Sequence, residues 1–228
     1  MHLQTNRLIL RDFTDEDFDS LFEILSDPEV MKYYPKPFDA ERVKGWIKWN
    51  QENYKKYGFG LWAVCLKDSG KLIGDCGITI QNIDGELLPE IGYHIHKDFW
   101  RQGFASEAAA TVRDWAFKNT KYDYLYSYMK YSNVPSCKTS QKIGMKKLKE
   151  YPDEKNDVSF AFVLSRASVS EIITGLQWML NDPQHESKGM LSVIAAYFTE
   201  VLKCSDWSLI AYAGYVALLI LHVFSKGK

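Results

Sequence analysis

The chain has 228 residues, enough for one domain with a full hydrophobic core and an additional segment. Its 28 Lys and Arg residues balance 29 Asp and Glu residues to a formal net charge of −1, so no global positive field indicates a nucleic-acid partner. The four cysteines are scattered without C-x-x-C spacing, which argues against a zinc site or a disulfide framework and favours a reducing compartment. We therefore expect neither a metal ion nor nucleic acid to bind.

The first predicted strand, residues 8–10, is flanked by Arg7 and Arg11. An apolar run this short cannot serve as the apolar region of a signal peptide, so we expect a cytoplasmic location. Apolar residues then recur at helical spacing over residues 18–25, behind a cap of aspartate and threonine.

The following elements alternate between strand and helix patterns, with glycine, proline and aspartate at the turns. In chain order they are a tryptophan-rich helix ending near 58, a hairpin of 59–66 and 72–80, a strand entered at 90, a helix at 103–118, a strand at 124–130, a helix from 133 to 144 and a strand at 158–164. The complete order β-α-α-β-β-β-α-β-α-β predicts a mixed α/β sheet with helices on both faces.

The residues after 167 follow another pattern. Ser168 and Glu171 form a capping box before an apolar stripe that ends at Pro183. A second apolar stripe covers residues 191–202, and residues 207–225 are uncharged and apolar nearly all round. We expect an all-α C-terminal extension of about three helices, of which the last is strongly apolar.

This extension, residues 167–228, is predicted to be separate from a domain at residues 1–166. A run of about 18 or more apolar residues is long enough to span a membrane. Two amphipathic helices before it would nevertheless need an apolar partner, and a helix apolar all round suits the centre of a bundle. The sequence therefore favours packing within the chain or across a homodimer, with a membrane anchor at residues 207–225 as the alternative.

The most informative segment is residues 90–108, which predicts a strand, a glycine turn and a helix start. The first N–H groups of a helix have no intrahelical partners and lie at the positive end of its dipole, so they can bind a phosphate. Gly103 allows close approach to the backbone, and the small Ala105 leaves room. The same turn could also be a purely steric connection.

Four separated segments carry a family resemblance. They are Thr5-Asn6-Arg7-Leu8-Ile9-Leu10-Arg11 with Ser26-Asp27-Pro28, Trp62-Ala63-Val64 with Gly70-Lys71-Leu72-Ile73-Gly74, residues 90–108, and Asn133-Val134-Pro135-Ser136 ending in Lys142-Ile143-Gly144-Met145. In this order they resemble the GNAT superfamily of N-acetyltransferases, in particular the branch of ribosomal-protein N-terminal acetyltransferases. The resemblance covers residues 1–166 and implies the GNAT fold, with acetyl-CoA as co-substrate.

The resemblance also implies where acetyl-CoA binds. Its diphosphate would meet the N–H groups of residues 101–106, and its pantetheine arm would lie along residues 93–95 like an added strand. A backbone N–H near Tyr93 would stabilise the oxyanion of the reaction. The expected cofactor-binding residues are Tyr93, His94, Ile95, Arg101, Gln102, Gly103, Phe104, Ala105, Ser106, Asn133, Ser136 and Lys138. By residue type alone, His94 could equally be a packed ring and Asn133 a helix cap.

Glu90 is the candidate catalytic base. An amine arrives mostly protonated near neutral pH, and a carboxylate in an apolar strand has a raised pKa that suits proton transfer. The alternative role is a structural ion pair with a lysine or arginine. Many family members use a tyrosine seven residues after the asparagine of the last motif to protonate the CoA thiolate, but this chain has Ser140 there. Water, or a neighbour such as Tyr128, would then supply that proton, or the thiolate would leave unprotonated.

These features predict an acetyl-CoA-dependent N-acetyltransferase that acts on a primary amine, either a protein N-terminus or a small molecule. The amine would attack directly in a ternary complex. The alternative is a weakly catalytic acyl-CoA-binding module whose C-terminal extension serves for oligomerisation or membrane anchoring.

Overall fold

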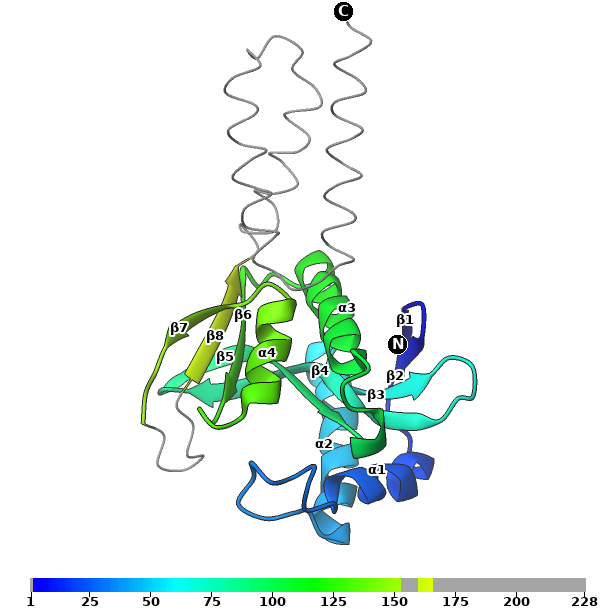
Figure 1. The fold of residues 1–228 in the computed structure, drawn as a ribbon. Coiled ribbons are helices and arrows are strands. Elements are labelled where there is room, and N and C mark those ends of the chain that lie inside the picture. Colours follow the sequence, from blue (N-terminus) through cyan, green and yellow to red (C-terminus); the bar gives the residue numbers. More distant parts are fainter. Residues whose placement is uncertain (1, 153–159, 166–228) are drawn as a thin grey trace, which may run out of the picture. The chain divides into compact units, whose positions relative to one another are not determined.

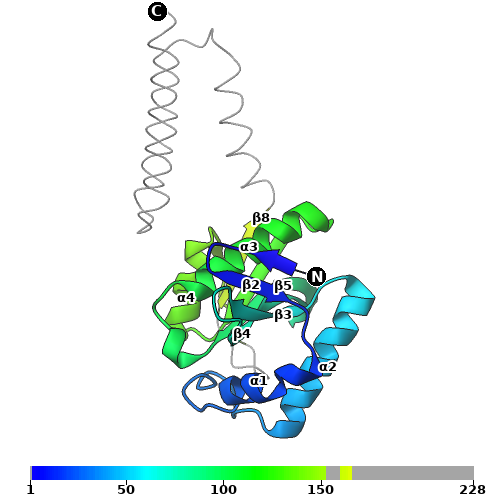
Figure 2. The same ribbon diagram turned by 90° about the vertical axis from the view of Figure 1, so that its right-hand side faces the viewer.

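The computed structural model describes residues 2–152 and 160–165, which form one mixed sheet with helices on both faces (Figures 1 and 2). Within these residues the sheet has eight strands in the order β1-β2-β3-β4-β5-β6-β8-β7. The strands are β1 (His2–Gln4), β2 (Leu8–Arg11), β3 (Leu61–Leu66), β4 (Leu72–Ile83), β5 (Glu86–Ile95), β6 (Tyr124–Met129), β7 (Lys146–Lys149) and β8 (Phe160–Ser165). The mixed α/β fold that the sequence predicts is thereby confirmed.

The helices divide between the two faces of the sheet, with α1 and α2 on one face and α3 and α4 on the other (Figures 1 and 2). Their bounds are α1 (Phe18–Leu25), α2 (Ala40–Tyr57), α3 (Phe104–Asn119) and α4 (Val134–Lys142), and the short 3-10 helices are η1 (Asp15–Asp17) and η2 (Lys97–Phe99). Local signals explain where α2 starts and stops. The Asp39 carboxylate caps its first turn by accepting from the N–H of Arg42 at 2.9 Å, and Gly58 ends it in a left-handed conformation.

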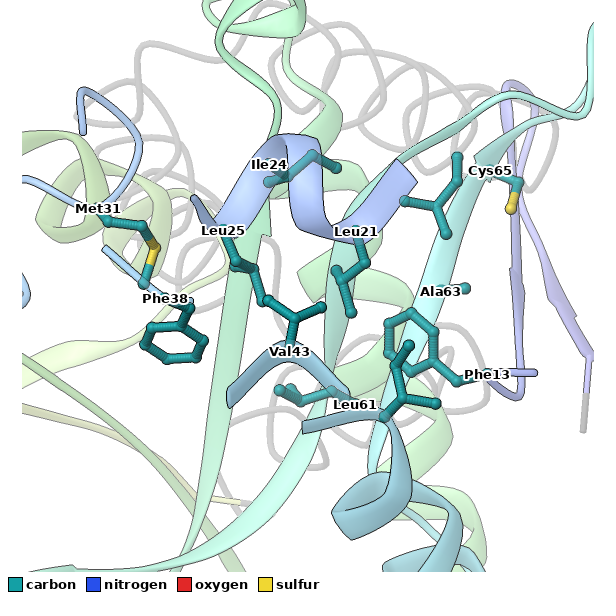
Figure 3. Close-up of a cluster of buried hydrophobic side chains, with 12 residues drawn as sticks. Phe13, Leu21, Ile24, Leu25, Met31, Phe38, Val43, Leu61, Ala63 and Cys65 are labelled. Carbon is teal, nitrogen blue, oxygen red and sulfur yellow. The ribbon is translucent and has the colours of Figure 1, made fainter. Parts of the chain in front are cut away.

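A large apolar cluster lies between α1, α2 and the sheet (Figure 3). Leu21, Ile24 and Leu25 are buried on one face of α1, as their spacing of three and four residues predicts. Phe38, in the connection between α1 and α2, joins this cluster and contacts Trp46 with ring centroids 5.5 Å apart. The connection is therefore packed against the core at the place where the candidate site lies.

Two strands are absent from the sequence-based prediction. β1 has three residues, and all four residues of β7 are exposed, so neither shows the apolar alternation that identifies a strand. They pair at the two edges of the sheet, β1 with β2 and β7 with β8. The last predicted strand, 158–164, corresponds to β8; positions 158 and 159 lie outside the described residues.

The C-terminal extension predicted at residues 167–228 also lies outside the described residues. In the part of the chain that the structure covers, no helix is long and apolar enough to cross a membrane. The apolar segment at 207–225 does not belong to that part.

The pairing of β5 with β6 positions the site. These strands run parallel, and their register pairs Glu90 with Tyr126. Beyond this pair, β5 continues to Ile95 in register with β4, and β6 continues to Met129 in register with β8. The two strands therefore part just after Glu90, and their separating ends lie next to the turn that leads into α3.

Candidate active site

The turn before α3 has the geometry of an anion-binding loop. Gly103 is the N-cap of α3 with φ 83°, and Arg101 has φ 62°, so two residues of the turn are left-handed. A left-handed arginine is strained, and such strain concentrates at functional sites. The N–H groups of Phe104, Ala105 and Ser106 open the helix and have no intrahelical acceptors. This loop fits the diphosphate of a CoA molecule, which needs several N–H donors at a positive helix end.

Gly103 is required here for its conformation. There is space for a side chain, because a Cβ at this position would lie 3.6 Å from its nearest neighbour, Nη2 of Arg7. The left-handed backbone conformation is what disfavours residues other than glycine.

Arg7 holds the loop in place from the connection between β1 and β2. Its Nε donates to Glu107 Oε2 at 2.7 Å, its Nη1 donates to the carbonyl of Gln102 at 3.0 Å, and its guanidinium lies 4.2 Å from the centre of the Phe104 ring. Thr5 also donates to Glu107, at 2.5 Å. Partial burial opposes ionisation of Glu107, but the hydrogen bonds from Thr5 and Arg7 hold its pKa below the usual range. Arg7 is thus a supporting residue that the predicted site residues did not include.

Polar side chains form a row on the α1 and α2 face of β4 and β5. In register, Thr79 of β4 lies opposite Glu90 of β5, and Asp75 lies opposite His94. Gly92 falls between Glu90 and His94 on this face, since side chains in a strand alternate with period two. Two proton-accepting groups therefore flank a position that carries no side chain.

Glu90 is buried, with 9% of its surface exposed, and accepts a hydrogen bond from Thr79 Oγ1 at 3.2 Å. Burial raises its pKa to about 7, although Thr79 and His94 act in the opposite direction. Among the described residues, no lysine or arginine forms an ion pair with Glu90. The geometry therefore favours a proton-transfer group over a structural ion pair.

His94 is held by Asp75 and Tyr34. Its backbone N–H donates to Asp75 Oδ1 at 2.9 Å, and its Nδ1 lies 2.8 Å from the same oxygen. Its Nε2 is 2.8 Å from the hydroxyl of Tyr34. Because Asp75 already holds its N–H, His94 contributes its side chain to the acceptor side, and its N–H is not available to a pantetheine arm.

Tyr93 points to the opposite face, toward α4. Its hydroxyl donates to the carbonyl of Ser136 at 2.9 Å and lies 3.4 Å from Ser140 Oγ. Burial raises the pKa of Tyr93. The serine in place of the family's tyrosine thus has a tyrosine hydroxyl beside it, contributed by β5. Tyr128 packs against the apolar cluster of Ile83, Tyr151 and Ala161 and also raises the pKa of Tyr34.

The start of α4 brings the remaining predicted residues near this strand. Asn133 caps the helix by accepting from the N–H of Ser136 at 3.2 Å, as a capping asparagine should. Lys138 is exposed on α4, and Ile95 is buried at the end of β5. The predicted residues therefore gather into three groups, on β5, on the turn before α3, and on the first part of α4.

Sequence reasoning missed Asp75, Thr79, Tyr34 and Trp46. Asp75 could have been noticed as the lone carboxylate in an otherwise apolar strand pattern, because a buried acid needs partners. Tyr34 lies in a connection without periodicity, and no local signal predicts its contact. Within the described residues, no group of three or more His, Cys, Asp or Glu side chains could hold a metal ion.

Comparisons with known proteins point to the same family. Residues 7–146 match the Acetyltransferase (GNAT) domain. The chain is 33% identical over 149 residues to the uncharacterized N-acetyltransferase YnaD of Bacillus subtilis (strain 168), a match that covers 64% of this chain and 84% of that protein.

Solved structures share the fold. An acetyltransferase from Agrobacterium tumefaciens str. C58 has a TM-score of 0.64 at 25% identity and covers 73% of this chain and 95% of its own. The RimL ribosomal L7/L12 alpha-N-protein acetyltransferase, solved in complex with coenzyme A, has a TM-score of 0.61 at 12% identity. The match covers 72% of this chain and 98% of the RimL chain. The predicted enzyme class, an N-acetyltransferase, is confirmed, and the chain belongs to the GNAT family of acetyltransferases.

Proposed function

We propose that this enzyme transfers the acetyl group of acetyl-CoA to a primary amine by direct attack in a ternary complex, with Glu90 as the base. The observation that carries the proposal is the Glu90 carboxylate. It is buried, has a pKa of about 7, and lies where β5 and β6 part. A base with a pKa near the working pH combines a useful ionised fraction with a useful proton affinity.

Residues from three parts of the fold would contact acetyl-CoA. The turn at residues 101–106 supplies N–H donors for the diphosphate, and the parting ends of β5 and β6 leave the edge of β5 toward Tyr93 and Ile95 for the pantetheine arm. We assign Asn133, Ser136 and Lys138, at the N-cap and in the first half of α4, to the same ligand. Acetyl-CoA contributes the activated thioester, and the protein residues position it and move protons.

The reaction balances without a covalent enzyme intermediate. The amine nitrogen forms a C–N bond with the acetyl carbon, the C–S bond breaks, and the CoA sulfur takes up a proton. A cysteine nucleophile is disfavoured near Glu90, because Cys76 is fully buried and burial raises its pKa well above the usual value.

The acceptor side of Glu90 suits a cation. Beside it, the rings of Tyr34 and Trp46 contact His94, and the carboxylates of Glu90 and Asp75 add negative charge. Aromatic faces and carboxylates both attract an ammonium group. An acceptor amine of a protein N-terminus or of a small molecule fits this chemistry, and the RimL neighbour is named for an N-terminal protein substrate.

The cysteines Cys65, Cys76 and Cys137 are free thiols, which favours the reducing cytoplasm as the place of action. The C-terminal extension at 167–228 is assigned to packing within the chain or between two copies of it.

The test is release of free CoA after mixing the protein with acetyl-CoA and a panel of amines, including peptides with free N-termini and polyamines. Glu90→Gln should lower turnover by roughly 10²–10⁴-fold, with CoA affinity nearly unchanged. Glu86→Gln is the matched control, because Glu86 is an exposed glutamate of the same strand. Tight acetyl-CoA binding without CoA release for any amine would instead support an acyl-CoA-binding module.

A further inference from the structure

A second set of buried polar groups lies beside Glu90. Asp75 is fully buried in β4 and accepts three hydrogen bonds, from the N–H of His94 at 2.9 Å, from His94 Nδ1 at 2.8 Å and from Trp46 Nε1 at 3.0 Å. Several donors compensate a carboxylate for its loss of water. Asp75 is therefore held in one orientation by β5 and α2, and it fixes the imidazole of His94.

The hydrogen-bond pattern indicates which atoms of this set donate and which accept. A carboxylate can only accept, so Nδ1 of His94 carries the proton toward Asp75, and Nε2 of the neutral ring is an acceptor. The hydroxyl of Tyr34, 2.8 Å from Nε2, then donates to it. We call Tyr34, His94 and Asp75 the triad.

The triad leads from solvent to the interior. Tyr34 is 39% exposed and lies in the connection between α1 and α2, whereas His94 is 9% exposed and Asp75 is fully buried. The Tyr34 hydroxyl itself faces inward, where burial raises its pKa, so a proton that it gives up can be accepted by an imidazole whose positive charge is stabilised by a buried carboxylate.

The position of the triad relative to Glu90 is specific. Glu90 and His94 lie on the same face of β5, on either side of Gly92. The Glu90 carboxylate lies over Gly92, because a Cβ there would be 3.0 Å from Oε2. An amine placed at this position has one proton acceptor on each side.

Acetylation of an ammonium ion needs two acceptors. The first proton must leave before the nitrogen can attack, and the second must leave as the C–N bond makes the nitrogen positive again. We propose that Glu90 takes the first proton and the triad takes the second, with the Tyr34 hydroxyl meeting the amine. This inference rests on the proposed function and deepens it.

The attacking nitrogen gives its proton to the Tyr34 oxygen while the tyrosine proton moves to His94 Nε2, which leaves an imidazolium beside Asp75. The C–S bond breaks and the sulfur takes up one proton. The other proton leaves for solvent, so both carboxylates and the imidazole return to their starting states.

The electrostatics around the triad support an imidazolium. Burial alone would lower the pKa of His94, but the carboxylates of Asp75 and Glu90 outweigh burial, and the pKa lies above its ordinary value. The titratable and charged groups that face the triad are Asp75 from β4, Glu90 from β5, Tyr128 from β6 and Arg42 from α2, the last two through their effect on Tyr34. An imidazolium formed here is therefore stabilised by two negative neighbours.

The first experiment uses the best amine from the panel. Tyr34→Phe keeps the ring that packs against Phe38 and His94 but removes the hydroxyl. We expect kcat to fall by roughly 10²-fold, the usual worth of a positioned acid or base, with unchanged CoA affinity and an altered pH–rate profile. The control is Tyr33→Phe, since Tyr33 contacts Lys32 and lies outside the triad. A wild-type rate and profile for Tyr34→Phe would overturn the proposal.

A second experiment separates the two acceptors. A weakly basic amine is already neutral at the assay pH, so only its second proton must be removed. With such an amine, the loss caused by Glu90→Gln should shrink, while the loss caused by Tyr34→Phe should persist. Equal recovery of both variants would show that the triad does not accept the second proton.

A third measurement does not depend on turnover. In nitrogen NMR of the full chain, Asp75→Asn should lower the pKa of the His94 imidazole, because the carboxylate beside it is lost. An unchanged titration would overturn the triad. If His94 titrates as expected but the protein acetylates no amine, the proposed function is contradicted. If Tyr34→Phe acetylates amines at the wild-type rate, only the role of the triad is overturned.

Discussion

Gly92 lies directly beneath the carboxylate of Glu90, and a Cβ at Gly92 would come within 3.0 Å of Glu90 Oε2. The absence of a side chain at Gly92 is thus a condition for the observed position of the candidate base. The relationship arises because the two residues are two apart in β5 and share one face of the strand.

Gly92→Ala should therefore displace the Glu90 carboxylate without unfolding the protein. A displacement of this kind can reduce catalysis by up to about 10²-fold, so we expect kcat to fall by about tenfold or more, with CoA affinity retained. Gly45→Ala is the matched control, because a Cβ at Gly45 in α2 meets nothing within 4 Å. Steady-state kinetics of both variants check the prediction, and a Gly92→Ala enzyme with full activity would contradict it.

The stability of the protein should depend on Glu90 and pH in a defined direction. Folding raises the pKa of this carboxyl from its ordinary 4.5 to about 7, so the native state retains a proton that the unfolded chain releases in this interval. Linkage then makes the contribution of Glu90 to the free energy of unfolding fall by about 3 kcal/mol as pH rises from 4.5 to 7.

Glu90→Gln removes this titration, so the variant should gain stability over the wild type as pH rises and be clearly more stable at pH 8. Below pH 4.5 the two should converge. Urea unfolding of both proteins at several pH values measures the difference. If the difference in unfolding free energy between the two proteins does not change with pH, folding does not raise the pKa of Glu90.

Gly103→Val should lower CoA affinity by at least about tenfold, because a β-branched residue cannot hold the left-handed conformation that shapes the turn. Gly70→Val is the control, since Gly70 is also left-handed but lies in the hairpin between β3 and β4. Isothermal titration calorimetry with CoA gives the comparison. Equal affinities for wild type and Gly103→Val would remove the basis for placing the diphosphate at residues 101–106.

Arg7→Gln should raise the KM for acetyl-CoA more than it lowers kcat, because Arg7 holds the turn through Gln102 and Glu107 and lies away from the acceptor side. Arg7→Lys should restore little, since lysine cannot form the same forked set of contacts. Kinetics with acetyl-CoA as the varied substrate test this. If Arg7→Lys has the wild-type KM for acetyl-CoA, the positive charge of Arg7 is sufficient and its forked contacts are not needed.

Removal of residues 167–228 should change the oligomeric state or the stability of the protein more than its CoA affinity. The reason is that two amphipathic stripes and an apolar segment together would bury one another, and a truncated chain loses that packing. Analytical ultracentrifugation and CoA titration of both forms check this. A full-length protein that sediments with membranes and resists high salt and alkaline wash would favour the anchor at 207–225.

Much of the fold follows from local sequence. α1 is predicted at its observed bounds, because the apolar spacing of Phe18, Leu21, Phe22 and Leu25 is a local signal. The strand, glycine turn and helix start at residues 90–108 are equally local, and so is the placement of Glu90 in a largely apolar strand. The short strands β1 and β7 could not be read, because their stability comes from pairing with an edge and not from a buried face.

The tertiary structure alone decides which side chains meet. Asp75 and His94 are 19 residues apart, and His94 and Tyr34 are 60 apart, so no local spacing indicates that they form one hydrogen-bonded set. The register of β4 on β5 places the first pair, and the packing of the connection between α1 and α2 places Tyr34. The sequence by itself determined the elements and the residue types of the site, because period and capping act within a few residues. Register and packing assembled those residues into a site, because both depend on contacts between segments that are distant in the chain.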